Sequence, residues 1–204
     1  MNLTNLTNFL NFTNSSKINM NPVLLDFPDS FDTDRLTLRC PRLGDGARVN
    51  AVILESQAEL RPWFVWMKTL ATVEEHEALM REAQGKWIKR EQLWLLAFLK
   101  GTDELVASTG LHNCNWEVPS FEVGYWCRTK YVGQGYVTEA TKAITHFAFE
   151  HLHARRLQLF CDDRNTRSAV TAERSGFQLE GVLRNDSLDV DGNVRDTRVY
   201  SIVK

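Results

Sequence analysis

The chain has 204 residues, with 24 basic and 26 acidic side chains, so its formal net charge is −2. This length suits one domain with a sizeable core. The near-neutral charge excludes a protein that coats nucleic acid, because such proteins carry a strong basic excess. No apolar run reaches the ~18–20 residues that span a bilayer. We therefore expect a globular domain that binds neither nucleic acid nor a membrane.

The cysteines indicate free thiols rather than a disulfide framework or a zinc site. None lies in a C-x-x-C pair, and no His/Cys cluster has the spacing of zinc ligands. Each falls in or beside a strand-like run, where a free cysteine behaves as a small apolar residue. We expect a protein of the reducing cytoplasm that binds no metal. The cysteines are Cys40, Cys114, Cys127 and Cys161.

The N-terminal segment differs in composition from the rest of the chain. Residues 1–30 are rich in Asn and Thr and lack the basic start and sustained apolar core of a signal peptide, so we expect a disordered tail there. Residues 31–204 show no internal repeat or linker and are expected to form one domain.

The first half of the domain predicts a strand followed by two helices. Residues 35–40 alternate apolar and polar side chains, as in a half-buried strand, and residues 45–60 follow as a helix. Thr72 and Glu75 form a capping-box signature that opens a second helix, which runs to about Arg90. Its expected apolar stripe consists of Leu79, Ala83, Trp87 and Ile88.

The second half of the domain is richer in strands. Strands are expected at residues 93–99, 104–116, 121–127, 157–161, 177–189 and 194–203, and helices at residues 133–152 and 165–175. The last two strands form a hairpin around the Asp191-Gly192-Asn193 turn. The order predicts an α/β (α+β) domain with a mixed, mostly antiparallel sheet of six to seven strands flanked by about four helices.

A glycine-containing loop joins the strand at residues 121–127 to the helix that follows it. Gly133 and Gly135 allow the backbone to approach a ligand closely, and the free amides of the helix N-terminus attract an anion. Thr138 places a hydroxyl in the first turn of the same helix. The loop is neither a Rossmann fingerprint nor a P-loop, because no third glycine and no G-K-[ST] follow. It predicts a phosphate or pyrophosphate site.

This loop resembles the pyrophosphate loop of the GNAT superfamily of N-acetyltransferases, [QR]-x-x-G-x-[GA], with Lys130 in place of the usual Gln or Arg. Three further segments resemble its RimJ/RimL-like branch, the ribosomal-protein N-terminal acetyltransferases. They are T-x-R-L-x-L-R (Thr33, Arg35, Leu36, Leu38, Arg39), E-x-G-Y-W (Glu122, Gly124, Tyr125, Trp126) and N-x-x-S followed by G-F (Asn165, Ser168, Gly176, Phe177).

The resemblance implies the GNAT fold, in which the fourth and fifth strands splay apart and acetyl-coenzyme A, the co-substrate, lies in the gap. It implies that Trp126 and Cys127 offer backbone groups to the pantetheine arm and that Asn165 bonds its amides. The residues expected at the pyrophosphate are Lys130, Val132, Gly133, Gln134, Gly135, Tyr136, Val137 and Thr138.

Two residues are candidates for proton transfer. Glu122 is the candidate base, acting directly or through a water, although it could equally face solvent or pair with an arginine. Many GNAT enzymes use a tyrosine as the acid at the position of Ala172, so Ser168 is the candidate proton donor here; its alternative role is to cap a helix. Trp63, Trp66 and His112 are the candidate acceptor-binding residues.

The substrate leaves more than one interpretation open. The resemblance favours a protein N-terminal α-amine, which attacks the thioester directly, over a small-molecule amine such as a polyamine, amino acid or antibiotic. A third interpretation keeps the fold but makes the chain a non-catalytic acyl-coenzyme A sensor. The exposed final hairpin and the resemblance favour a homodimer.

Overall fold

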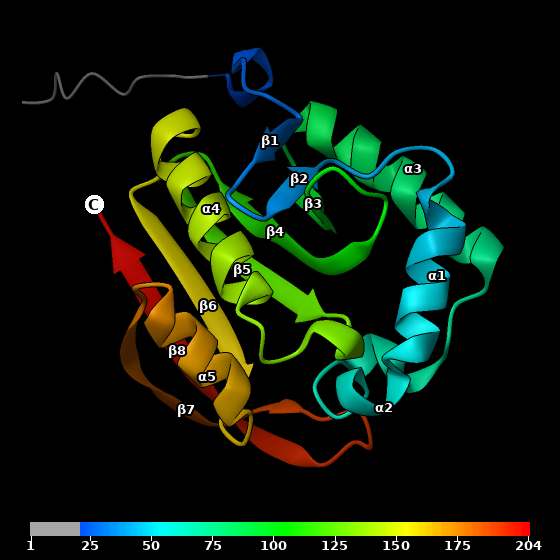
Figure 1. The fold of residues 1–204 in the computed structure, drawn as a ribbon. Coiled ribbons are helices and arrows are strands. Elements are labelled where there is room, and N and C mark those ends of the chain that lie inside the picture. Colours follow the sequence, from blue (N-terminus) through cyan, green and yellow to red (C-terminus); the bar gives the residue numbers. More distant parts are fainter. Residues whose placement is uncertain (1–20) are drawn as a thin grey trace, which may run out of the picture.

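The computed structural model describes residues 21–204, so most of the predicted tail, residues 1–20, lies outside the described residues. Eight strands form one sheet in the order β1-β2-β3-β4-β5-β6-β8-β7, antiparallel everywhere except between β5 and β6 (Figure 1). The strands are β1 (Ser30–Asp32), β2 (Leu36–Arg39), β3 (Leu93–Leu99), β4 (Leu105–Asn115), β5 (Ser120–Cys127), β6 (Arg156–Asp162), β7 (Gln178–Leu188) and β8 (Val194–Val203).

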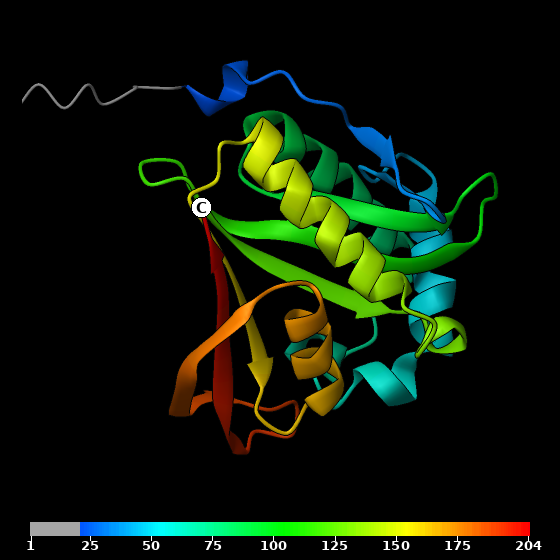
Figure 2. The same cartoon turned by 60° about the vertical axis from the view of Figure 1, so that its left-hand side comes forward.

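Helices cover both faces of the sheet (Figure 2). α4 lies on one face of the central strands, α1 and α3 lie on the other, and α5 packs beside β6 and β7. None of the helices within residues 21–204 is long and apolar enough to cross a membrane. The helices are α1 (Asp45–Glu55), α2 (Gln57–Leu60), α3 (Val73–Lys89), α4 (Tyr136–His151) and α5 (Thr166–Arg174). Short 3₁₀ turns lie at Pro22–Leu24, Val65–Lys68 and Thr129–Tyr131.

The strand count exceeds the predicted six to seven because of β1. Its three residues are too few to show an alternating pattern in the sequence. Two residues of the segment that leads to β1, Leu25 and Phe27, contact the domain. The Phe27 ring lies 5.7 Å from Trp87 and 5.4 Å from Phe147, and Arg90 donates to the Leu25 carbonyl at 2.7 Å.

The helix predicted over residues 45–60 is broken at Ser56, which separates α1 from α2. The hydroxyl of this buried residue accepts the backbone N–H of Thr129 at 3.0 Å, so the break anchors the segment that leads into the glycine loop. The break is invisible in the sequence because its partner lies 73 residues away.

The predicted start of α3 is confirmed, whereas its predicted apolar stripe is confirmed only in part. The Thr72 hydroxyl accepts the Glu75 N–H at 3.1 Å, and the Glu75 carboxylate accepts the Thr72 N–H at 2.7 Å. Ala83 and Trp87 are buried, as predicted, whereas Leu79 is 41 % and Ile88 66 % exposed. The buried side of the helix is completed by His76 and Met80, which the predicted stripe left out.

The fourth and fifth predicted strands, at residues 121–127 and 157–161, correspond to β5 and β6. These two strands splay apart, as the resemblance implies. They pair only between residues 120–122 and 156–158, and beyond this short ladder they diverge (Figures 1 and 2). The C-terminal half of β5 therefore bonds to β4 on one side only. Its other edge is left free to meet a ligand.

Candidate active site

The gap between the splayed strands is a cavity of about 490 Å³. Its walls are the C-terminal half of β5, the loop that leads into α4, the N-terminal turns of α4 and α5, and residues of the segment after α2. Of the residues predicted to bind the cofactor, those in its lining are Trp126, Cys127, Val132, Gly133, Gly135, Tyr136, Val137, Thr138 and Asn165.

The mouth of this cavity is the predicted anion site. Gly133 and Gly135 have φ angles of 81° and 82°, in the left-handed region that favours glycine. Gly135 is the N-cap of α4, and no side chain caps the helix there. The first amides of α4 are therefore available to a ligand, and the helix dipole favours a negative charge beside them.

Arg35, in the opening strand motif, holds this loop in place. Its Nη1 donates to the Gln134 carbonyl at 3.1 Å, and its Nε donates to Glu139, in the first turn of α4, at 2.6 Å. Thr33 donates to the same carboxylate at 2.6 Å, and the guanidinium lies 4.3 Å from the centre of the Tyr136 ring. The motif that resembles a family signature therefore acts structurally, by fixing the start of α4.

Lys130 and Gln134 do not line the cavity. The Lys130 ammonium lies 3.0 Å from Glu104, and the Gln134 side chain donates back to the Lys130 carbonyl at 3.1 Å. Two arginines of α5, Arg167 and Arg174, do line it. Among the described residues, neither forms an ion pair with a carboxylate, so both are available to phosphate groups.

Asn165 and Ser168 meet at the start of α5. The Asn165 carboxamide oxygen accepts the Ser168 N–H at 3.1 Å, as an N-cap does, which leaves the amide NH₂ of Asn165 for a ligand. The Ser168 hydroxyl lies 3.0 Å from the Tyr125 hydroxyl, and Tyr125 also donates to the Ser168 carbonyl at 3.0 Å. Ser168 therefore does not cap the helix with its side chain.

Tyr125 is a site residue that we did not single out from the sequence. Burial raises the pKa of its hydroxyl well above the ordinary range, so the group stays protonated at neutral pH. It lines the cavity just described and a second one beside it. The E-x-G-Y-W motif contained the tyrosine, but its role depends on α5, which lies 43 residues further along the chain.

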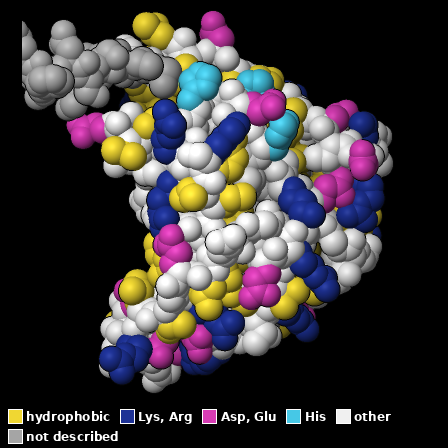
Figure 3. Space-filling view, turned by 90° about the vertical axis from the view of Figure 1, so that its left-hand side faces the viewer, with side chains coloured by type: hydrophobic (Ala, Val, Ile, Leu, Met, Phe, Trp, Pro, Cys, Tyr) yellow, Lys and Arg dark blue, Asp and Glu magenta, His cyan; other side chains and the backbone are white. Residues whose placement is uncertain are grey.

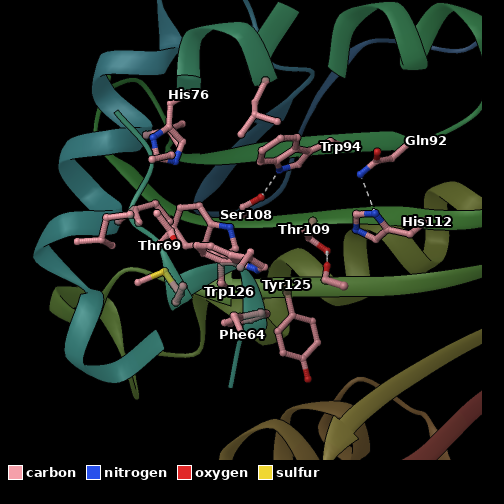
Figure 4. Close-up of a pocket in the computed structure, with 18 residues that line it drawn as sticks. Phe64, Thr69, His76, Gln92, Trp94, Ser108, Thr109, His112, Tyr125 and Trp126 are labelled. Atoms are coloured by element: carbon pink, nitrogen blue, oxygen red, sulfur yellow. Dashed lines mark hydrogen bonds between the residues drawn. The ribbon is translucent and has the colours of Figure 1, made fainter. Parts of the chain in front are cut away.

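The second cavity, of about 510 Å³, lies on the sheet face that α1 and α3 cover (Figure 4). It meets the first at Phe64, Tyr125 and Trp126, which line both. Trp66 and His112, two of the three predicted acceptor-binding residues, line this cavity, and Trp63 lines the first one. The further apolar residues in its lining are Val49, Ile53, Met67, Leu70, Ala71, Leu79 and Trp94.

The polar groups of the second cavity are few and mostly paired. Trp94 donates to the Ser108 hydroxyl at 2.5 Å, and the Gln92 amide lies 2.7 Å from Nδ1 of His112 (Figure 4). None of the described residues that line it is an Asp, Glu, Lys or Arg. The cavity therefore suits an uncharged or apolar group, because a buried charge without a partner is strongly disfavoured.

Glu122 lines neither cavity. Its carboxylate accepts an amide N–H of Asn113 at 2.7 Å, and in the sheet it stands opposite His112. The structure thus brings Ser168 to the first cavity and His112 to the second cavity, but it places the candidate base Glu122 opposite His112 in the sheet, outside both linings.

Burial raises the pKa of the Cys127 thiol to about 11. Cys127 lines the first cavity, yet at neutral pH its thiol is protonated and therefore a poor nucleophile. Nothing in this environment lowers the pKa as a catalytic cysteine requires.

A mixed sheet whose strands diverge beside an uncapped helix N-terminus, with a second cavity adjoining the gap, suits an α/β protein that binds an anionic ligand beside a second molecule. The chain belongs to the GNAT acetyltransferase family, whose Acetyltransferase (GNAT) domain matches residues 35–178. It is an acetyl-coenzyme A-dependent N-acetyltransferase, and it is similar to proteins of the RimJ/RimL kind.

Known proteins resemble the chain over most of its length. It is 26 % identical over 172 residues to YdaF of Bacillus subtilis (strain 168), named as a candidate ribosomal N-acetyltransferase, with 84 % of this chain and 92 % of YdaF covered. It is 28 % identical over 123 residues to the ribosomal-protein-serine acetyltransferase of Escherichia coli (strain K12), covering 57 % and 69 %. The structure of Mycobacterium smegmatis RimJ in complex with CoA-disulfide superposes with a TM-score of 0.77 at 25 % identity, covering 90 % of each chain.

Proposed function

We propose that this enzyme transfers the acetyl group of acetyl-coenzyme A to the α-amine of a protein N-terminus, of the kind that ribosomal-protein acetyltransferases modify. The observation that carries the proposal is the meeting of the two cavities at Phe64, Tyr125 and Trp126. One cavity has the features of a coenzyme A site, and the other is open to an amine at the point where the thioester would lie.

The residues of the first cavity fit coenzyme A. The amides at the start of α4 suit the pyrophosphate, and Arg167 and Arg174 suit the remaining phosphate charge. The free edge of β5 at Trp126 and Cys127, together with the Asn165 carboxamide, offers hydrogen bonds to the amides of the pantetheine arm. A backbone N–H on the same edge would stabilise the oxyanion that forms at the thioester.

The transfer proceeds by direct attack of the amine on the thioester. Cys127 is excluded as an acetyl carrier because its thiol stays protonated. Ser168 supplies the proton for the departing sulfur, and Tyr125 holds the Ser168 hydroxyl in position. Glu122 supports removal of the amine proton from outside the cavity, through a water or through His112, which stands opposite it in the sheet.

The lining of the second cavity favours an α-amine over a polyamine. A polyamine carries several positive charges, and no described lining residue is acidic. An α-amine has a pKa of about 7.7–8.0, whereas a lysine amine has one of about 10.4, so far more of an α-amine is neutral at pH 7. The Escherichia coli relative is named for a ribosomal-protein serine, which is an acceptor of this class.

Release of free thiol from acetyl-coenzyme A tests the proposal. The substrates are peptides that begin with Ser, Ala or Met, the same peptides with a blocked N-terminus, and a polyamine. We expect release only with the free peptides. Release with the polyamine alone would assign the enzyme to small amines, and coenzyme A binding without any release would make it a sensor.

The four free cysteines fit a protein of the reducing cytoplasm.

A further inference from the structure

Two facing glycines clear the space that the His112 side chain occupies. Gly110 on β4 pairs with Gly124 on β5, on the sheet face that borders the second cavity. A Cβ atom added at Gly124 would lie 3.0 Å from His112 Nε2, and one added at Gly110 would lie 3.3 Å from it. The imidazole therefore lies against the floor of the cavity, where any larger residue at Gly124 would displace it.

Gln92 fixes the other edge of the ring. Its side-chain amide lies 2.7 Å from His112 Nδ1 (Figure 4). When the carboxamide turns its oxygen to Nδ1–H, the lone pair of the imidazole is on Nε2. Nε2 is the ring atom that lies over the paired glycines at the cavity floor. The ring can then accept a proton at Nε2 while Gln92 keeps its hydrogen bond to Nδ1.

The two charges that act on His112 have opposite effects on its pKa. Burial is the main cause that lowers the pKa of His112; the positive charge of Lys86, on α3, lowers it further, and the negative charge of Glu122, on β5, raises it. Gln92, on β3, is neutral, and burial keeps the pKa of His76, the other histidine of the cavity, below its ordinary value. At pH 7 the imidazole is therefore neutral and free to accept a proton.

We propose that His112 is the proton acceptor for the amine substrate, with Gln92 as its positioning residue, Gly124 as the residue that makes room for it, and Glu122 as the charge that stabilises the imidazolium. This proposal rests on the proposed function. It gives Glu122 an indirect role, which agrees with its place opposite His112 in the sheet and outside the cavity lining.

With this assignment, every proton in the transfer reaction is accounted for. As the ammonium enters the site it gives one proton to His112 Nε2, so the amine that occupies the cavity is uncharged. The amine nitrogen bonds to the thioester carbonyl carbon, and the carbon–sulfur bond breaks. The remaining excess N–H proton passes to the departing sulfur, by way of Ser168, so that an amide and the coenzyme A thiol form. His112 then returns its proton to water.

A pair of charge substitutions tests the proposal, because their effects on His112 have opposite signs. Glu122→Gln removes a negative charge and should lower the pKa of His112, whereas Lys86→Gln removes a positive charge and should raise it. The acid limb of the pH profile of kcat/KM should move to lower pH in the first variant and to higher pH in the second. NMR titration of the His112 ring, which needs no acceptor, should show the same two shifts.

Substitutions at the ring itself provide the second test. His112→Gln should lower kcat about a hundredfold and abolish the acid limb, since glutamine does not titrate. Gly124→Ala should lower kcat by displacing the ring, with coenzyme A affinity unchanged. The matched control is His146→Gln, on an exposed histidine of α4, which should leave the pH profile as it is.

The outcomes separate this proposal from the proposed function. If the NMR pKa of His112 shifts in the charge variants but the kinetic limb does not follow, or if His112→Gln keeps the limb, His112 is not the proton acceptor, although peptide acetylation by the wild-type enzyme stands. A wild-type enzyme that binds coenzyme A and acetylates none of the peptides contradicts the proposed function, and the role of His112 falls with it.

Discussion

At the scale of single residues, the hydroxyls of Tyr125 and Ser168 are hydrogen-bonded to each other. They lie 3.0 Å apart where the two cavities meet, and burial keeps the tyrosine protonated. We predict that Ser168→Ala lowers kcat about a hundredfold, in the range of lost proton transfer. Tyr125→Phe should lower kcat less, because it removes only the group that orients Ser168. Steady-state kinetics should show little change in the KM for acetyl-coenzyme A. A rise in this KM as large as the fall in kcat would contradict the assignment.

The Cys127 thiol should be dispensable. Its pKa of about 11 keeps it protonated, so it cannot carry the acetyl group at neutral pH. We predict that Cys127→Ala retains most of the activity. Intact mass spectrometry of the wild-type enzyme, incubated with acetyl-coenzyme A alone, should show no acetylated protein. An acetyl-enzyme that disappears in Cys127→Ala would instead establish a two-step mechanism.

At the scale of elements, the start of α4 depends on a backbone conformation that only glycine adopts readily. Gly135 has a φ of 82° and caps the helix. We predict that Gly135→Ala costs about 1–2 kcal/mol of unfolding free energy and weakens coenzyme A binding. Urea unfolding and calorimetric titration measure the two effects.

The matched control for this substitution is Gly85→Ala. Gly85 lies inside α3, its φ is not positive, and an added Cβ meets nothing within 4 Å. Alanine there should raise the unfolding free energy by about 0.5–1 kcal/mol and leave coenzyme A binding unchanged. Equal effects of the two substitutions would show that the loop conformation at Gly135 does not matter.

Elements that depend on local pattern were predictable. The capping box at Thr72 and the hairpin around the Asp191-Gly192-Asn193 turn follow from nearby residues, and the structure confirms both. The break at Ser56 and the three-residue β1 were not predictable, because partners far along the chain decide them.

The same limit applies to the candidate site. The glycine loop could be predicted from the sequence because the loop's own glycines allow its backbone conformation. The pairing of Lys130 with Glu104 and the position of Tyr125 against Ser168 depend on how separate elements pack. Likewise, the sequence does not reveal that Arg164 is paired with Asp162 while Arg167 faces the cavity.

At the scale of the whole molecule, two buried histidines link stability to pH. Burial lowers the pKa of His76 and of His112 in the folded protein, whereas in the unfolded chain both lie near 6.5. Below pH ~6.5 the unfolded chain therefore binds more protons than the folded one, and stability falls. We predict a lower urea midpoint at pH 5.5 than at pH 7.5. An unchanged or higher midpoint would contradict the neutral state of the two rings.

The homodimer expected from the sequence stays a prediction. The edge strand β7 exposes Leu179, Val182 and Leu183, which a second copy would cover. Figure 3 shows one side of the molecule, on which hydrophobic side chains lie among basic and acidic ones. Light scattering of the wild type and of Leu183→Glu would measure the association, and an equal mass for both as monomers would exclude it.

The most direct test of the central claim is to locate the acetyl group on a product. A peptide that begins with Ser and contains one internal lysine is incubated with the enzyme and acetyl-coenzyme A, and tandem mass spectrometry identifies the modified nitrogen. We predict one acetyl group on the N-terminal amine for each coenzyme A thiol released, and none on the lysine. Acetylation of the lysine alone, or no acetylation by an enzyme that binds coenzyme A, would contradict the account.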